Sequence, residues 1–312
     1  MKRPFVLSLA VLTALVALPF VPAAASAAPS PRDTRIVFSR NGVGNHDIYS
    51  MTSIGTNVVA LLNPAGVEDL NPVVSPDGKQ IALTRYGAGP DDLWVMNADG
   101  SGLTVVPGSG RTGQASWSPD GKRLAYECRE PLWSDRSYIC VRDVTGANFQ
   151  LLSWTAASND RTPDWSPDGT RIAWTRWTGG NSQLLVLTLK GMSLDPITPL
   201  VAGRHDHDVA WSPDSKQIAF SRYESGSGLG SSLYRIPATG GQEKLIIAGP
   251  PIANDTYLTM PSWSADGTTI AYSARDDDEG WGNIWTITPN GKNNTQLTFG
   301  TATDMNPDWL PV

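Results

Sequence analysis

Two histidines one residue apart, His205 and His207, form the arrangement in this sequence that is most typical of a metal site. In an extended segment, residues i and i+2 point to the same side, so both imidazoles could hold a zinc or another transition-metal ion if a third ligand lies nearby. The only other histidine is His46. A solvated loop without metal is the alternative, and the sequence leaves both interpretations open.

Carboxylates gather in a second place, the segment RDDDEGWGN around Trp281. Asp276 and Asp278 offer the hard oxygen ligands that suit a divalent cation such as calcium, although the segment lacks the spacing of an EF-hand loop. A solvated acidic loop is the competing hypothesis. No other cofactor is predicted.

Aromatic residues recur in or beside the polar segments that follow one type of predicted strand. An exposed aromatic rim would bind a peptide or a glycan, whereas the alternative is that the rings only cover the strand ends. These residues are Trp133, Trp177, Trp281, Tyr86 and Tyr223.

The elements that position these candidates come from an internal repeat. Six segments align on a phrase of the type PDWSPDG, at spacings of 43 to 52 residues, which is the period of a four-stranded propeller blade. The aligned positions are Val74, Trp117, Trp165, Trp211, Trp263 and Trp309. Each unit has a strand A, an S-P-D-G turn and strands B, C and D, but the last unit stops after strand A, and residues 34–62 supply its B, C and D. The prediction is an all-β fold over residues 34–312, a six-bladed β-propeller closed by pairing of the N- and C-terminal strands.

Four units carry an aspartate at the start of strand A and an arginine at the end of strand B. If P-D-G is a three-residue hairpin loop, the two residues face each other across the strands. The pairs are Asp69 with Arg85, Asp160 with Arg176, Asp206 with Arg222, and Asp304 with Arg40. Opposed charges of this kind stabilise a strand pair by about 0.2–1 kcal/mol, so we predict ion pairs that support the architecture rather than a ring of carboxylates for a cation.

The second unit has neither charge and instead contains Cys128, followed by Cys140. These are the only cysteines, so in an exported chain the simplest prediction is one disulfide. Such a bond would act as a strut in place of the ion pair and contribute about 2–3 kcal/mol in the chain-entropy model.

The N-terminus has the layout of a secretory signal peptide: Lys2 and Arg3, an apolar run over residues 5–21, and the small-residue segment PAAASAAPS. We predict a signal peptide over residues 1–27, a linker over 28–33, and no membrane span after cleavage. About 285 residues remain, with 22 basic and 30 acidic residues and a formal charge of −8. This balance argues against nucleic acid as a partner, and we expect an exported monomer that is periplasmic or secreted.

Phrases such as TPDWSPDGTRIA and DIYSMTSIG resemble the propeller of TolB, the periplasmic member of the Tol-Pal envelope system, and its WD40-like relatives. The resemblance covers nearly the whole predicted mature chain, and it implies a six-bladed propeller that binds a lipoprotein partner at one face. About six residues separate the predicted cleavage site from the first strand, so the α/β domain that precedes the propeller in TolB is not part of the resemblance.

The function predicted from these observations is that of a non-enzymatic binding or scaffold protein, which engages a protein, peptide or envelope glycan at the channel mouth. Trp133 and the acidic segment around Trp281 belong to opposite units and could clamp an extended, partly cationic peptide. The alternative is a carbohydrate-active or other metal-assisted enzyme, a lyase or hydrolase, at the same mouth. The sequence has no G-x-S-x-G nucleophile motif.

Overall fold

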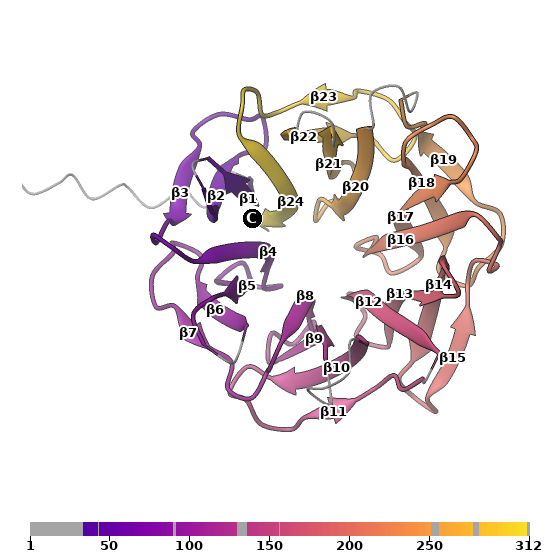
Figure 1. The fold of residues 1–312 in the computed structure, drawn as a ribbon, viewed down its shortest axis with the longest axis horizontal. Helices are drawn as coiled ribbons and strands as arrows, with labels where there is room; N and C mark the ends of the chain where they lie inside the picture. Colours follow the sequence, from indigo (N-terminus) through magenta and orange to yellow (C-terminus); the bar gives the residue numbers. More distant parts are fainter. Residues whose placement is uncertain are drawn as a thin grey trace, which may run out of the picture. The chain divides into compact units, whose positions relative to one another are not determined.

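The β-sheets of this protein are arranged as a ring around a common centre (Figure 1). The computed structural model describes residues 34–42, 44–89, 92–129, 136–155, 157–250, 256–276 and 281–310. Within these ranges there are four four-stranded sheets and one eight-stranded sheet, so the chain is an all-β propeller. No helix in the described ranges has the length and apolar character that a membrane crossing requires.

We number the repeats by the order of their inner strands. Repeat 1 contains β4 (Glu68–Val74), β5 (Gln80–Tyr86), β6 (Leu93–Asn97) and β7 (Thr104–Val105). Repeat 2 contains β8 (Thr112–Trp117), β9 (Arg123–Cys128), β10 (Tyr138–Asp143) and β11 (Gln150–Leu151). Repeat 3 contains β12 (Ser158–Trp165), β13 (Arg171–Thr178), β14 (Asn181–Thr188) and β15 (Ser193–Pro196). Repeat 4 contains β16 (Arg204–Trp211), β17 (Gln217–Glu224), β18 (Ser232–Pro237) and β19 (Lys244–Ile247). Repeat 5 contains β20 (Thr256–Trp263), β21 (Ile270–Asp276), β22 (Trp281–Ile287) and β23 (Thr295–Gln296). The closing repeat contains β24 (Thr303–Leu310), β1 (Arg35–Asn41), β2 (His46–Thr52) and β3 (Val59–Leu62).

Each sheet is packed between two neighbouring sheets, and this explains the composition of the second strand of every repeat. In β5, the five residues from Ile81 to Arg85 are all buried, so the strand is covered on both faces and does not alternate between buried and exposed residues. The inner strands β4, β8, β12, β16, β20 and β24 surround the centre in Figure 1. Repeats 3 and 4 form the eight-stranded sheet through a single parallel pair, Ser182 with His205.

The ring is closed by the two ends of the described chain, as the sequence predicts. β1 pairs antiparallel with β24, with Arg35 opposite Leu310 and Arg40 opposite Asp304. Because every inner strand then has a neighbour in its own sheet, this pairing removes an open inner edge.

The S-P-D-G turn differs from the prediction. A three-residue loop would place Trp165 opposite Arg171, but Trp165 pairs with Ile172, and the Ser166 N–H donates to the Arg171 carbonyl at 2.9 Å. The loop therefore has four residues, and the three-residue assignment was wrong. A β-bulge in β12 then shifts the register back by one, so Asp160 still faces Arg176.

The bulge is a repeated feature of the inner strands. Thr162, in the bulge of β12, has φ 51°, a left-handed conformation that is costly for a β-branched residue. Residues at the equivalent position also have positive φ: Asn71, Asp208, Met260 and Asn306. These residues line the channel, so the bulges shape its wall.

Repeat 4 has Ser215 in place of the turn glycine, with φ 59°. The Ser215 hydroxyl accepts a hydrogen bond from the Asp168 N–H at 3.0 Å, and its carbonyl accepts one from Arg171 Nη2 at 2.7 Å. These bonds to the turn of repeat 3 offset the local cost of a non-glycine residue in this conformation.

Candidate functional site

The aspartate and arginine pairs lie in direct contact. In repeat 3, Arg176 Nε and Nη2 each donate to one carboxylate oxygen of Asp160, both at 2.7 Å. The same two-bond arrangement, with distances of 2.5 to 3.1 Å, joins the other pairs: Asp69–Arg85, Asp206–Arg222 and Asp304–Arg40. All four carboxylates are buried, so each is neutralised inside the wall and none is open to a cation in the channel.

In three of these pairs, the arginine also contacts an aromatic ring on the third strand of the repeat. The Arg85 guanidinium lies 5.4 Å from the Trp94 ring, and the equivalent contacts are Arg40 on Tyr49 at 5.2 Å and Arg222 on Tyr234 at 4.6 Å. In repeat 2, the strand register places Cys128 at the arginine position and Cys140 at the ring position, and the two form a disulfide with a Cα–Cα distance of 5.9 Å. In repeat 2, the disulfide thus takes the place of the arginine–aromatic contact.

Repeat 4 carries a larger charged network than its sequence motif indicates. Arg204 donates to Asp206 at 3.0 Å and to Glu243 at 2.5 Å, and Arg222 donates to the same glutamate at 2.8 Å. Arg204 and Glu243 were missed because they lie outside the aspartate and arginine positions that the repeats share.

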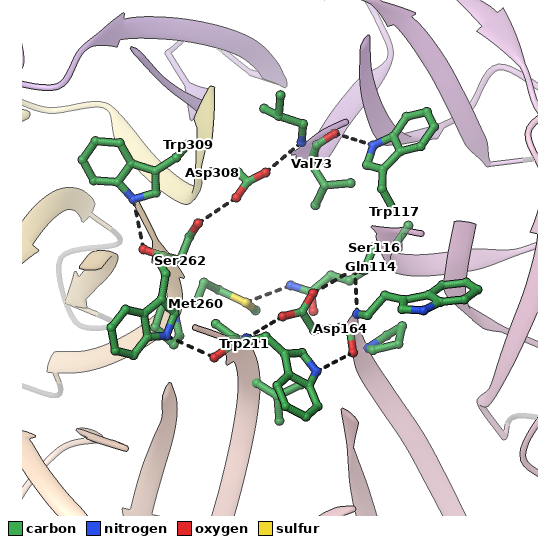
Figure 2. Close-up of a pocket in the computed structure, with 18 of the residues that line it drawn as sticks. Val73, Gln114, Ser116, Trp117, Asp164, Trp211, Met260, Ser262, Asp308 and Trp309 are labelled. Atoms are coloured by element: carbon green, nitrogen blue, oxygen red, sulfur yellow. Dashed lines mark hydrogen bonds between the residues drawn. The ribbon is translucent and has the colours of Figure 1, made fainter. Parts of the chain in front are cut away.

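We call the face with the S-P-D-G turns the turn face, and the face where the inner strands begin the loop face. At the turn face the channel forms a cavity of about 450 Å³ (Figure 2). Two carboxylates, Asp164 and Asp308, occupy equivalent positions in repeat 3 and in the closing repeat. Each accepts one bond from a serine of the preceding repeat and one from a backbone N–H of the following repeat. The donors to Asp164 are Ser116 Oγ at 2.8 Å and Trp211 N at 2.7 Å, and those to Asp308 are Ser262 Oγ and Val74 N, both at 2.7 Å.

Burial in this cavity raises the pKa of Asp164 and of Asp308 to about 6, although the hydrogen bonds to each carboxylate act in the opposite direction. These two residues were not predicted as a site, because the aspartate of P-D-W belongs to the repeat motif. Their shared position, three repeats apart, is the signal that would have revealed them.

These pKa values predict how stability depends on pH. A carboxyl group with a higher pKa in the folded chain than in the unfolded chain holds its proton more tightly when folded, so it favours folding below about pH 4 and loses that advantage as the pH rises to about 6. We expect Asp164→Asn to gain about 1–2 kcal/mol relative to the unchanged chain between pH 4.5 and pH 8, after discounting for water in the cavity. Thermal unfolding of both proteins at the two pH values measures this, and a difference that does not change with pH would contradict it.

Four of the repeat tryptophans donate an indole hydrogen bond to a neighbouring repeat. Trp211 Nε1 donates to the Asp164 carbonyl at 3.0 Å, and the Arg171 guanidinium lies 4.6 Å from its ring. Equivalent indole bonds reach back one repeat from Trp117 to Val73, from Trp263 to Ala210 and from Trp309 to Ser262, at 3.0 to 3.2 Å. The motif on which the repeats align is therefore an inter-sheet contact.

The loop-face half of the channel is a second cavity, of about 590 Å³. One wall is a row of rings from repeats 3, 4 and 5, in which His205 lies between Trp177 and Tyr223 and the row continues to Tyr257. The ring centroids are 5.3, 5.7 and 6.1 Å apart along the row. We call these four residues the aromatic row.

The structure brings together only some of the predicted binding residues. Trp177 and Tyr223 line the loop-face cavity, but Tyr86 does not, and its hydroxyl donates to the Thr112 carbonyl at 3.0 Å. Trp133 and Asp278 lie outside the described residues, as do the side chains of Trp281 and Asp276. Tyr257 was missed because its role depends on the neighbouring repeat.

His205 and His207 both line this cavity, as expected for alternate residues of a strand. Burial lowers the pKa of His205, with a further contribution from His207. Burial also lowers the pKa of His207, but the Asp208 carboxylate, 2.9 Å from its Nδ1, raises it above the usual value. Within the described ranges, no three His, Cys, Asp or Glu side chains come together in a way that could hold a metal ion.

Large apolar side chains are exposed around the loop face. They lie in the connections that end at or leave this face, because successive strands of each sheet run antiparallel. The residues are Trp154, Leu200, Val201, Leu229 and Phe299, with Trp154 62% and Phe299 72% exposed. Most of this rim was missed because four of its five residues follow the fourth strand of a repeat and not the second.

The two halves of the channel differ in charge. The described residues that line the turn-face cavity include Asp164, Asp208 and Asp308 and no basic residue. Among the described residues that line the loop-face cavity are Arg275 and the two histidines, without a carboxylate. Three residues line both cavities and form a partition between them: Asn71, Met260 and Asn306.

The fold and the two cavities define a β-propeller with a divided central channel. A sequence profile described as "TolB beta propeller domain" matches residues 134–312, more than half of the chain, so the protein belongs to this family. The resemblance to TolB found in the repeats is thereby confirmed.

Curated relatives match over part of their length. A "Protein TolB homolog" of Chlorobium luteolum (strain DSM 273) is 30% identical over 159 residues, which are 50% of this chain and 34% of the relative. The "Tol-Pal system protein TolB" of Gluconobacter oxydans (strain 621H) is 35% identical over 102 residues, 31% of this chain and 22% of the relative. The matched part thus spans about a third of these relatives or less.

Solved structures show the same fold at lower identity. TolB from Acinetobacter baumannii superposes with a TM-score of 0.75 at 19% identity, covering 91% of this chain and 68% of that one. A putative TolB from Agrobacterium tumefaciens gives a TM-score of 0.66 at 17% identity, with 89% and 99% covered. At these identities the likeness establishes the fold alone.

Proposed function

We propose that the protein is an exported six-bladed β-propeller that binds an extended segment of a partner protein at its loop face. The observation that carries this proposal is the loop-face cavity, where the aromatic row opens beneath a rim of exposed apolar side chains. Contiguous apolar and aromatic surface around a concave site is typical of protein interaction sites. Membership of the TolB β-propeller family supports a binding role.

The count of six blades is supported by the strand order. The eight-stranded sheet divides into repeats 3 and 4, which share one residue pair, and each of the other sheets is one blade. Residues 1–27 act as a signal peptide in this proposal, residues 28–33 as a linker, and the mature chain lies in the periplasm or outside the cell. The Cys128–Cys140 disulfide agrees with an oxidising compartment.

In this proposal the partner contacts Trp177 and Tyr223 in the cavity, and Trp133 and Trp281, which the sequence predicts as binding residues, contact the same partner. Buried aromatic anchors supply most of the affinity in such interfaces, because they remove a large apolar area from water at a small entropic cost. The ion pairs of the wall take no part in binding.

A capture experiment with envelope extract tests the proposed face. The double variant Trp177→Ala/Tyr223→Ala should retain at least tenfold less of the captured partner than the unchanged protein, since each ring is an anchor. The matched control is Lys79→Glu/Lys216→Glu on the turn face, where the two lysine side chains are 79% and 80% exposed. Circular dichroism establishes that both variants are folded. Loss of the partner in the lysine variant, together with its retention in the aromatic variant, would place binding on the turn face and overturn the proposal.

A further inference from the structure

The loop-face cavity contains polar groups that nothing in the described protein satisfies. Ser231 is 1% exposed and lines the cavity, and its hydroxyl has no hydrogen-bond partner. His205 Nδ1 is also buried without a partner, between the rings of Trp177 and Tyr223. A buried hydroxyl or imidazole without a partner costs free energy, and folded proteins leave few such groups unsatisfied.

Both residues line the cavity, and each carries a group that can donate a hydrogen bond. A serine hydroxyl rotates to suit its acceptor, and a neutral imidazole with its proton on Nδ1 donates from that atom. Arg275 lies in the same wall, directly across the strand pair from Tyr257 in the aromatic row. The cavity therefore combines two donors with a cation, and its described lining has no carboxylate.

We propose that this cavity binds a carboxylate group of the partner's peptide chain, through Ser231 Oγ, His205 Nδ1 and Arg275. The proposal rests on the proposed function, because it names the chemistry of the segment that the loop face receives. A carboxylate accepts hydrogen bonds from both donors and carries the charge opposite to that of Arg275, and charge-assisted hydrogen bonds of this kind are stronger than neutral ones.

The partition of the channel keeps such a group in the loop-face cavity. Asn306 Nδ2 donates to Asn71 Oδ1, and Gln114 Nε2 donates to the Met260 sulfur at 2.8 Å, so the partition is held together by side-chain contacts. On the other side of the partition, the described lining of the turn-face cavity has carboxylates and no basic residue, and like charges repel a further carboxylate there. A peptide carboxylate is therefore stabilised in the loop-face cavity and excluded from the turn-face cavity.

The rim favours a peptide over a sugar acid as the carrier of the carboxylate. Leu200 and Val201 precede the strand that bears His205, and Leu229 precedes Ser231 by two residues, all three exposed. Aliphatic side chains contribute affinity by burying apolar area, which a peptide provides and hydroxyl-covered sugars provide less well.

Small probes test the inference on the full mature chain. N-acetyl-leucine carries a free carboxylate, and N-acetyl-leucinamide is its neutral counterpart, so ligand-detected NMR titrations of both isolate the charge. We expect the acid to bind at least fivefold more tightly than the amide. N-acetyl-glutamic acid α-amide, whose carboxylate is on the side chain, shows whether the site takes a chain terminus or an acidic residue.

Variants connect this preference to the proposed groups. Ser231→Ala and Arg275→Gln should each weaken binding of the acid by fivefold or more, because each removes a bond to a charged group. Ser231→Ala should not lower the thermal unfolding temperature, since its hydroxyl has no partner in the unliganded protein. Ser39→Ala is the matched control: Ser39 is also fully buried with an unpartnered hydroxyl, but it lines neither cavity.

Three outcomes would overturn the inference: equal affinity for acid and amide, an unchanged affinity in Ser231→Ala and Arg275→Gln, or no binding of either acid at tens of millimolar. If one of these is found while capture of the partner still depends on Trp177 and Tyr223, the proposed function stands and only the carboxylate assignment fails. If that capture is also unaffected by the aromatic variant, both fail.

Discussion

Deletion of residues 304–312 is expected to leave the chain without a cooperative unfolding transition. The deletion removes most of β24, and with it the buried Asp304 that pairs with Arg40 and the indole of Trp309. Removing one partner of a buried ion pair costs about 3–5 kcal/mol, and losing a buried tryptophan costs about as much. Together these losses approach the whole stability of a typical domain, about 5–15 kcal/mol, and they also expose β1 as an inner edge.

Circular dichroism during heating and size-exclusion chromatography measure the outcome. The control is the double variant Arg40→Met/Asp304→Leu, which keeps β24 but replaces the ion pair with apolar residues of similar size. Such replacements are often neutral, so this variant should still unfold cooperatively. A truncated chain that is monomeric and unfolds at the temperature of the unchanged protein would show that β24 does not close the ring.

Trp211→Ala is expected to lower the free energy of unfolding by about 3–5 kcal/mol, the cost of truncating a large buried aromatic residue. Trp211 is 4% exposed, and its indole joins repeat 4 to repeat 3 through the Asp164 carbonyl and the Arg171 guanidinium. Trp211→Phe keeps a ring and loses the indole hydrogen bond, so its cost should be nearer 1–2 kcal/mol.

Urea denaturation of both variants gives the comparison. Trp177→Ala serves as the control, because it removes a tryptophan of the aromatic row and leaves the indole bonds between repeats in place. Equal losses in Trp211→Ala and Trp177→Ala would mean that the repeat tryptophans have no special part in holding neighbouring sheets together.

Much of the fold could be predicted because the same turn residues and the same strand pattern recur from repeat to repeat. The spacing of the tryptophans, the turn residues and the absence of strand A at the N-terminal end were sufficient to predict ring closure by β1 and β24. The prediction that Asp160 faces Arg176 assumed a loop of three residues, one fewer than the structure has. The prediction survived because the bulge at Thr162 shifts the register by one residue in the opposite direction.

The candidate site could be predicted only in part, because its residues meet across repeats. Trp177, His205, Tyr223 and Tyr257 come from three repeats, and no spacing within one repeat indicates that their rings form a row. Asp164 and Asp308 look like ordinary motif residues until their donors in the neighbouring repeats are known. Contacts of this kind depend on how neighbouring repeats pack against each other, and this packing could not be predicted from a single sequence.

Val74 stands where the other repeats have a tryptophan, so the junction between repeat 1 and the closing repeat has no indole bond, and its hydrogen bonds include those from Val74 N to Asp308 and from His46 N to Glu68. This junction adjoins the one sheet whose strands come from both ends of the chain, with Arg40 and Asp304 separated by 264 positions. During synthesis, β1 therefore cannot pair with β24 until repeats 1 to 5 have been made and are already available to fold. Sealing of the ring therefore depends on β24, which follows every other described strand along the chain, and the ribosome must have released β24 before β1 can pair with it.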